Sequence, residues 1–132
     1  MSDGFIIKRG GGGGDSNAAF KALVDRSITE VTADMLQGVT SISSGAFNNC
    51  TSLTSVTIPN SVTMIDGYAF DSCTSLASVT VEATNPPTLG NGIFSDTDTN
   101  LVIYVPAESV EIYKTAGRWS NYASKIQAIP SD

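Results

Sequence analysis

The sequence of 132 residues contains no histidine. Histidine is the commonest general base in enzymes and the commonest ligand for transition metals, so its absence disfavours catalytic triads and most metal chemistry. No serine lies in a Gly-x-Ser-x-Gly turn, and nothing in the spacing of Asp66, Asp71 and Glu82 pairs two carboxylates at one groove. We therefore expect a protein that is not an enzyme and that uses no cofactor and no structural metal.

Positive charge is scarce, with 7 Lys and Arg against 13 Asp and Glu and a net charge of −6. Nucleic acids and anionic lipids bind surfaces with a surplus of Lys and Arg, so neither is expected as a partner. Long apolar runs are also missing. No stretch reaches the roughly 18 to 20 residues that cross a bilayer, and residues 1–14 lack the apolar core of a signal peptide. We expect synthesis in the cytoplasm and no membrane insertion.

Cysteine is limited to Cys50 and Cys73, too few for a disulfide framework. The polar residues are mainly hydroxyls, with 17 Ser and 14 Thr, while charged residues make up only 15%. Together with 41% hydrophobic residues, this composition indicates a single β-rich domain, a solenoid or a sandwich, with enough apolar material for a core.

The centre of the sequence repeats itself, because residues 39–61 align with residues 62–84. The period is about 23 residues, a length typical of solenoid repeats. The tract Val56-Thr57-Ile58 ends its unit with strict alternation, which predicts a short strand with the apolar residues on one face. The residues that align are Val39 and Val62, Ile42 and Ile65, Phe47 and Phe70, Cys50 and Cys73, Leu53 and Leu76, Val56 and Val79, and Ile58 and Val81.

A unit of this length with one short strand cannot bury its apolar side alone, so it must stack on neighbouring units. Stacking pairs the strands in parallel about 4.8 Å apart and turns the aligned apolar residues into interior columns. Cys50 and Cys73 are then expected to be small buried thiols in a turn. Stacked units would also permit a disulfide between them by distance, although cytosolic synthesis disfavours one.

These tracts carry a family resemblance. Residues 45–59 and 62–76 resemble the BspA-type leucine-rich repeat of bacterial surface proteins, bacteriophages and some protozoa. Residues 28–31 resemble the strand of a preceding unit and residues 92–106 a following one, so the resemblance covers about residues 27–106. It implies an α/β solenoid, a curved right-handed leucine-rich-repeat superhelix with short parallel strands.

A solenoid exposes an apolar cross-section at each end, and a helical pattern flanks the repeats on both sides. In residues 15–26, Ser16 is a suitable N-cap and positions 20, 23 and 24 are apolar at helical spacing. In residues 107–132, Pro106 opens a helix, Gly117 ends it, and bulky residues follow. We expect helical caps at both ends.

Residues 1–14 have neither a repeat nor a helical pattern, and consist largely of a short apolar and basic tract followed by five glycines. Such a run ordinarily forms a flexible linker, and without a following Lys-Ser/Thr it does not predict a phosphate loop. We expect the tail to dock on another subunit. The layout of tail, glycine run and amphipathic segment resembles small repeat proteins of phages and prophages. The candidate docking residues are Phe5, Ile6, Ile7, Lys8 and Arg9.

The outward strand positions Ser55, Thr57, Ser78 and Thr80 form the candidate binding surface. Stacked side by side, they give a flat patch of hydroxyls suited to hydrogen bonding with sugars or polypeptide. Rows of Thr-x-Thr on flat solenoids also bind ice, but here Ser replaces one Thr in each unit. Short hydroxyl residues also simply suit an exposed strand, and that interpretation stays open.

The tract that follows the third unit has two interpretations. Asp96, Asp98 and Asn100 occupy positions 1, 3 and 5 of a calcium loop, whereas Leu101 and Ala107 replace its glycine and its bidentate glutamate. These replacements exclude a full EF-hand loop. A weak, partly hydrated calcium site and an acidic surface turn both remain compatible with the sequence.

Together these features predict a non-enzymatic component of a bacteriophage virion: a fibre tip, a decoration protein or a tail-associated protein. Other virion proteins would hold its tail, and its repeat face would adhere to a host-surface glycan or protein. One alternative is a bacterial cell-surface adhesion module of the BspA type, and another is an intracellular assembly or scaffold protein. A homo-oligomer is compatible with the sequence, although no heptad pattern demands one.

Overall fold

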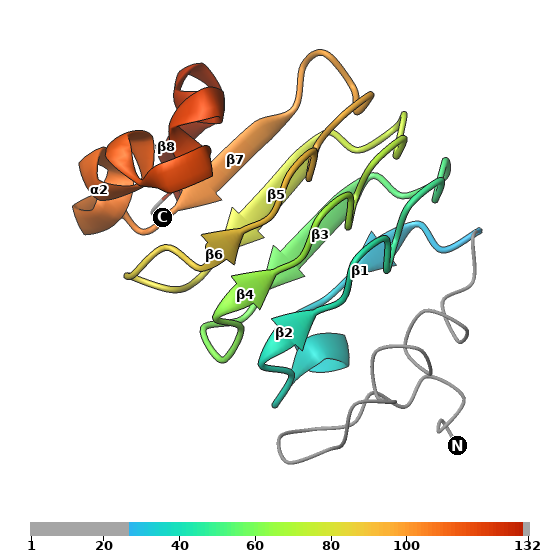
Figure 1. Ribbon diagram of the computed structural model, residues 1–132, viewed down its shortest axis with the longest axis horizontal. Helices are drawn as coiled ribbons and strands as arrows, with labels where there is room; N and C mark the ends of the chain where they lie inside the picture. Colours follow the sequence, from blue (N-terminus) through green and yellow to red (C-terminus); the bar gives the residue numbers. More distant parts are fainter. Residues whose placement is uncertain (1–26, 131–132) are drawn as a thin grey trace.

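The computed structural model describes residues 27–130. Short parallel strands stack in two sheets along the length of this part of the chain (Figure 1). The expected capping helix in residues 15–26 and the candidate docking residues Phe5 to Arg9 lie outside the described residues.

The larger sheet has five strands, in the order β1-β3-β5-β7-β8, and every neighbouring pair is parallel. In β3, β5 and β7 buried residues alternate with half-buried ones, as the sequence pattern predicts. The predicted units before and after the central pair are present as β1 and β7. The strands are β1 (Glu30–Val31), β3 (Ser55–Ile58), β5 (Ser78–Val81), β7 (Val102–Val105) and β8 (Ile126–Ala128).

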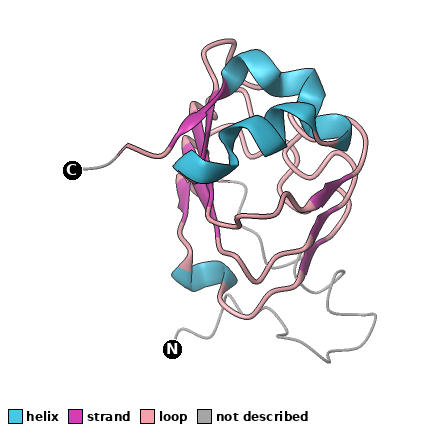
Figure 2. Ribbon diagram, turned by 90° about the vertical axis from the view of Figure 1, so that its left-hand side faces the viewer, coloured by secondary structure: helices cyan, strands magenta, loops and turns pink. Residues whose placement is uncertain are grey.

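A second sheet of three parallel strands faces the first across the core (Figure 2). It consists of β2 (Ser41–Ile42), β4 (Met64–Ile65) and β6 (Thr88–Leu89). The prediction of one strand in each unit is therefore wrong, because each central unit contributes a strand to both sheets. Two-residue strands show no alternation long enough to recognise in the sequence.

The strand register gives the period. Ser55 pairs with its aligned residue Ser78, which confirms the predicted period between the two central units. Glu30 pairs with Ser55, and Ser78 pairs with Val102. The flanking units are thus one or two residues longer than the central ones, while their strands keep the same neighbours.

The turns that connect the two sheets are as regular as the strands. The backbone N–H of Phe47 donates to Ala69 O at 2.8 Å, and that of Phe70 donates to Ile93 O at 3.1 Å. Left-handed backbone recurs at one position of each turn, with φ of 61° at Asn49, 63° at Ser72 and 57° at Asp96. The third side of the solenoid is therefore also held by bonds from unit to unit.

An aromatic column fills the core beneath these turns. The ring of Phe70 stacks between Phe47 and Phe94, with ring centroids 5.2 and 6.0 Å apart. Tyr122 closes the column edge-on against Phe94 at 5.2 Å. The predicted pairing of Phe47 with Phe70 in one interior column is confirmed.

Both cysteines are fully buried thiols that form no disulfide, and the burial confirms the prediction. The Cys73 thiol lies 3.1 Å from the carbonyl oxygen of Phe47 and donates a hydrogen bond to it. A hydrogen bond with Cys50 and burial of the sulfur both raise the pKa of Cys73. The thiol is thus held in its neutral form, which suits packing and not reactivity.

The C-terminal segment packs across the end of the stack, over the last repeat unit (Figure 2). The predicted helix over residues 107–115 is present as η3 and α2, but Gly117 begins a further helix. Strand β8 follows and extends the large sheet, which the sequence analysis did not predict. The helices of the described part are η2 (Asp34–Leu36), η3 (Ala107–Ser109), α2 (Val110–Thr115) and η4 (Gly117–Lys125), and none of them could span a membrane.

Candidate recognition surface

The outward face of the five-stranded sheet carries the four residues singled out in the sequence. The β3–β5 register sets Ser55 beside Ser78 and Thr57 beside Thr80, so the four side chains form a two-by-two array. Neighbouring strands lie about 4.8 Å apart, and residues two apart on a strand lie about 7 Å apart. The structure therefore brings together all four residues of the predicted surface.

Several hydroxyl side chains elsewhere in the repeats hold neighbouring units together. Thr54 Oγ1 donates to Thr29 O at 3.0 Å, and Ser61 Oγ donates to Val39 O at 2.9 Å. Thr63 and Ser44 bond to carbonyls of neighbouring units in the same way. This explains part of the abundance of Ser and Thr without any ligand.

The four hydroxyls on the outward face are different. Within residues 27–130, the side-chain oxygens of Ser55, Thr57, Ser78 and Thr80 have no hydrogen-bond partner in the protein. The residues are half-buried by their neighbours, yet the hydroxyls remain accessible. Each is both a donor and an acceptor, so the array can bind a partner with regularly spaced polar groups.

Strand β7 extends both rows of the array, which the sequence reasoning missed. Val102 pairs with Ser78, and Tyr104 pairs with Thr80 on one side and with Gln127 of β8 on the other. The step from β5 to β7 is one residue longer than the step from β3 to β5, so a strict alignment of the repeats does not bring these residues into the rows. Tyr104 adds an amphipathic ring, suited to contact either with a sugar or with a polypeptide.

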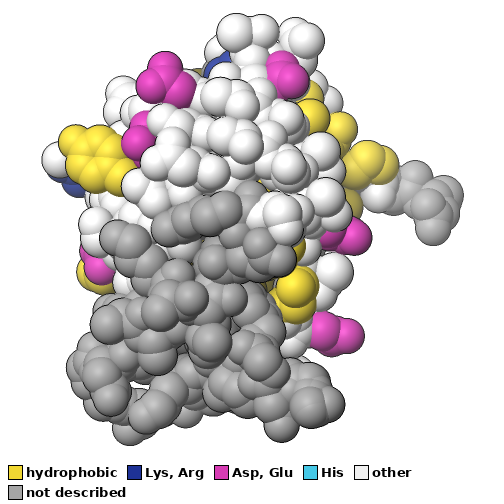
Figure 3. Space-filling model, turned by 90° about the vertical axis from the view of Figure 1, so that its right-hand side faces the viewer, with side chains coloured by type: hydrophobic (Ala, Val, Ile, Leu, Met, Phe, Trp, Pro, Cys, Tyr) yellow, Lys and Arg dark blue, Asp and Glu magenta, His cyan; other side chains and the backbone are white. Residues whose placement is uncertain are grey.

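The array holds no charged side chain. Glu30 and Glu82 stand at its margins, exposed to solvent. Charge is sparse on the turn side as well, where Figure 3 shows acidic side chains standing apart on a mainly uncharged surface. Glu30 pairs directly with Ser55 across the β1–β3 register, and each hydroxyl of the array can both donate and accept, so this face offers hydrogen bonding to a partner.

The tract considered as a calcium loop forms a turn. The carboxylate oxygen of Asp98 accepts a hydrogen bond from the backbone N–H of Asn100 at 2.7 Å, the geometry of an Asx turn. The hydroxyl of Thr97 donates to Phe94 O at 3.0 Å. In the described part of the chain, no three His, Cys, Asp or Glu side chains group where they could hold a metal ion. The local hydrogen bonds account for the acidic residues as turn formers.

Comparison with known proteins agrees with the repeat. The family model described as the BspA type leucine-rich repeat region matches residues 16–127 in six copies. No curated protein matches the chain. Repeats of this family are generally non-enzymatic modules for protein interaction and adhesion, and they imply a solenoid-like fold. The match spans most of the sequence and agrees with the stacked parallel strands, so the chain belongs to the BspA-type leucine-rich repeat family.

Proposed function

We propose that the chain is a non-enzymatic recognition protein that binds a host-surface glycan or protein through the outward face of the five-stranded sheet. The observation that carries the proposal is that four hydroxyls lie in register on one sheet face and have no partner in the described part. The hydroxyls of Thr54, Thr63 and Ser61, in contrast, bond to neighbouring units. Membership in a family of interaction repeats supports the same conclusion.

The binding test uses paired substitutions on the array. In the variant Thr57→Lys/Thr80→Lys, two long cations stand side by side where two hydroxyls lie in register. The protein is presented to whole cells and envelope preparations from a panel of bacteria. We expect the variant to lose at least tenfold in affinity for any surface that the unmodified protein binds.

The matched control is Thr51→Lys/Thr74→Lys. These threonines also occupy equivalent positions of the two central units, but both lie exposed in the turns, outside the array. The control makes the same change of residue and charge, so it should bind like the unmodified protein. An equal loss in both variants, or no loss in either, would contradict a binding role for the sheet face.

The finer part of the proposal is that the protein is a virion component of a bacteriophage, made in the host cytoplasm and held by its N-terminal tail. Its support is the layout of residues 1–31, which resembles that of small phage and prophage repeat proteins. Proteomics of density-banded particles tests it. A fixed ratio to the major capsid protein that survives a salt wash is expected, and absence from the particles would overturn the virion role. A BspA-type cell-surface module is then the leading alternative.

The C-terminal segment contacts the last repeat unit through two buried aromatic side chains. Tyr113 donates its hydroxyl to Ala83 O at 2.6 Å, and Trp119 donates its indole N–H to Pro87 O at 2.7 Å. Both side chains are buried against the last unit. We assign residues 107–132 as the C-terminal cap of a right-handed solenoid. Trp119 occupies the carbonyl of Pro87, whose counterpart in the preceding unit, Thr63 O, accepts the backbone N–H of Thr88 from the next unit.

A further inference from the structure

One turn position differs among the stacked units. Gly45 and Gly92 have left-handed backbone, with φ of 66° and 61°, and the unit between them places Tyr68 there with φ of 60°. Left-handed backbone is disfavoured for a bulky residue with a Cβ atom. Tyr68 is also 51% exposed, so burial in the core does not account for it. A strained, exposed aromatic residue among glycines calls for a functional explanation.

The ring of Tyr68 is seated on Gly92. A Cβ atom at Gly92 would collide with Cε1 of Tyr68, so only glycine leaves room for the ring. The backbone N–H of Tyr68 donates to Asn91 O at 2.8 Å, which fixes the turn that carries it. The pair Tyr68 and Gly92 therefore presents a flat aromatic ring to solvent at a fixed place.

A cation is held at Asn91, the residue before Gly92. The side-chain oxygen of Asn91 accepts a hydrogen bond from Arg118 Nε at 2.9 Å, and Leu89 O accepts one from Arg118 Nη1 at 3.3 Å. Within residues 27–130 Arg118 forms no salt bridge with a carboxylate, although the chain is acidic overall. Nη2 of Arg118 and the amide nitrogen of Asn91 keep N–H groups for a ligand.

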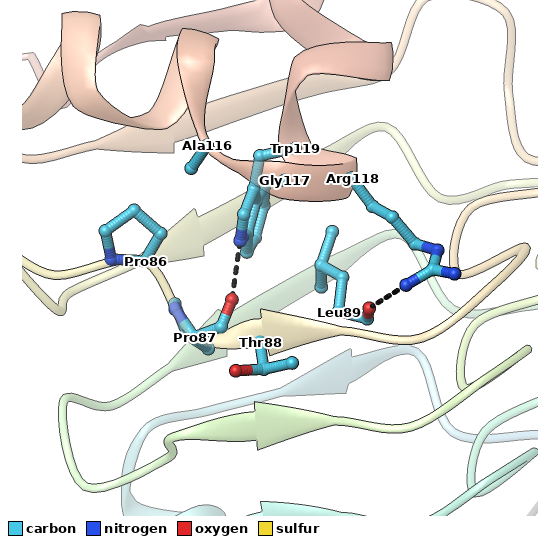
Figure 4. Close-up of a pocket in the computed structure, with 8 residues that line it drawn as sticks. All are labelled: Pro86, Pro87, Thr88, Leu89, Ala116, Gly117, Arg118 and Trp119. Carbon is cyan, nitrogen blue, oxygen red and sulfur yellow. Dashed lines mark hydrogen bonds between the residues drawn. The ribbon is translucent and has the colours of Figure 1, made fainter.

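A hollow adjoins the guanidinium, between β6 and the start of η4 (Figure 4). Its volume of about 220 Å³ is of the order of one sugar ring. Thr88 lies at one wall, and most of the other lining residues are apolar. The lining residues are Pro86, Pro87, Thr88, Leu89, Ala116, Gly117, Arg118 and Trp119.

We propose that Tyr68, Asn91, Arg118 and this hollow form a second binding site, for a glycan that carries a carboxylated pyranose. The carboxylated ring occupies the hollow with its carboxylate on Arg118, and the adjoining sugar stacks on Tyr68. A sugar combines an apolar C–H face with hydroxyl groups, which matches an aromatic ring beside N–H donors. The net charge of −6 disfavours highly charged anions such as nucleic acid or polyglutamate, and a single carboxylate on a sugar meets less repulsion than they do.

The site is separate from the hydroxyl array, because it is built on β6, η4 and the turns, whereas the array lies on β3 and β5. The inference therefore goes beyond the proposed function and stands without it. The Thr57→Lys/Thr80→Lys variant separates the two: it should bind carboxylated sugars as the unmodified protein does.

The first test replaces Tyr68 by glycine, the residue of both neighbouring units. The probes are oligosaccharides that end in glucuronic acid or sialic acid, measured by titration calorimetry against the neutral sugar lactose. Because glycine relieves the left-handed backbone, Tyr68→Gly should keep or raise the melting temperature and weaken binding at least tenfold. A lower melting temperature with unchanged sugar binding would show that Tyr68 only covers Gly92, and would overturn the proposal.

The second test replaces Arg118 by glutamine, which keeps a hydrogen-bonding side chain and removes the charge. Arg118→Gln should abolish the preference for acidic over neutral sugars, whereas Lys114→Gln on α2 should leave it intact. No binding of either acidic sugar at millimolar concentration would overturn the proposal. Equal binding of an acidic peptide and of the sugars would overturn the choice of a glycan in favour of a protein partner.

Discussion

The central units, residues 39–84, and the C-terminal segment, residues 107–130, satisfy backbone hydrogen bonds in different ways. Between central units the backbone of one unit bonds to the backbone of the next, as from Thr63 N to Thr40 O at 2.9 Å. At the C-terminal end, β8 still bonds to β7 through the backbone, but side chains supply most of the remaining bonds to the stack. The side chains of Ser109, Tyr113, Arg118, Trp119 and Lys125 donate to carbonyls 25 to 32 residues earlier in the chain.

The repeat units pack through features that any similar sequence can supply, whereas the C-terminal segment packs through particular side chains. A repeat unit needs only the same backbone path and an apolar residue in each column, so neighbouring units tolerate one or two additional residues. In the smaller sheet, β6 has no further strand to bond with, so the carbonyls of Pro87 and Leu89 accept side-chain donors from Trp119 and Arg118. This end of the stack depends on a few long donors, each at one particular position, and we expect substitutions there to act through individual bonds.

The largest effect is expected in the middle of the aromatic column. Phe70→Ala removes a fully buried ring that stacks on both Phe47 and Phe94, and should lower the free energy of unfolding by about 3–5 kcal/mol. Tyr122 is the half-buried ring at the end of the same column and contacts only the ring of Phe94 there. Tyr122→Ala should therefore lower the free energy of unfolding by less than Phe70→Ala does. Urea denaturation of both variants measures the difference. An equal loss would contradict a continuous column.

Next in size is the side-chain bond at the C-terminal end. Tyr113→Phe removes the hydroxyl that donates to buried Ala83 O and should destabilise the protein by about 1–3 kcal/mol. The matched change between central units is Thr63→Val. Thr40 O also accepts the backbone N–H of Thr63 at 2.9 Å, so this change should stay within about 0.5 kcal/mol. Comparable losses in thermal or urea unfolding would remove the contrast between the two regions.

The same tyrosine predicts a pH dependence. Burial raises the pKa of the Tyr113 phenol, so the folded state favours its neutral form. Its contribution to stability is complete below the pKa of an unfolded tyrosine, near 10, and is lost as the pH rises above that value. The free energies of unfolding of the unmodified protein and of Tyr113→Phe should therefore approach each other as the pH rises from 8 to about 11. A constant gap between the curves would contradict a buried neutral phenol.

The smallest effect concerns the turns. Ser72 has φ of 63°, a conformation that glycine adopts freely, so Ser72→Gly should stabilise the protein by about 0.5 kcal/mol. Ser75→Gly, three residues away and without positive φ, is the control and should destabilise slightly. Differential scanning calorimetry resolves the sign. Destabilisation by both changes would show that the Ser72 side chain outweighs its backbone strain.

The sequence predicts the central units well because their apolar residues recur at one fixed offset. Strands β3 and β5, the Phe47–Phe70 column and the burial of both cysteines all follow from that alignment. The elements that were missed have no periodic signal. Strands β2, β4 and β6 are two residues long, and β8 lies after helices that interrupt the repeat.

Of the two candidate binding surfaces, the sequence predicts one and not the other. The array of Ser55, Thr57, Ser78 and Thr80 is readable from alternation alone, whereas Tyr104 joins it only through a register offset by one residue. The second site was not predicted, because Tyr68, Asn91 and Arg118 are brought together by stacking and by the C-terminal segment. A tyrosine at a position that is glycine in both neighbouring units was a signal within the aligned repeats.

Photocrosslinking tests the central claim, that the outward sheet face is the recognition surface, most directly. A photoreactive phenylalanine analogue is placed at Thr80 in one protein and at Thr74 in another, and each is irradiated on a cell envelope that the unmodified protein binds. The array predicts covalent capture of an envelope component from position 80 and none from position 74. Capture from position 74 without capture from position 80 would contradict recognition through this face.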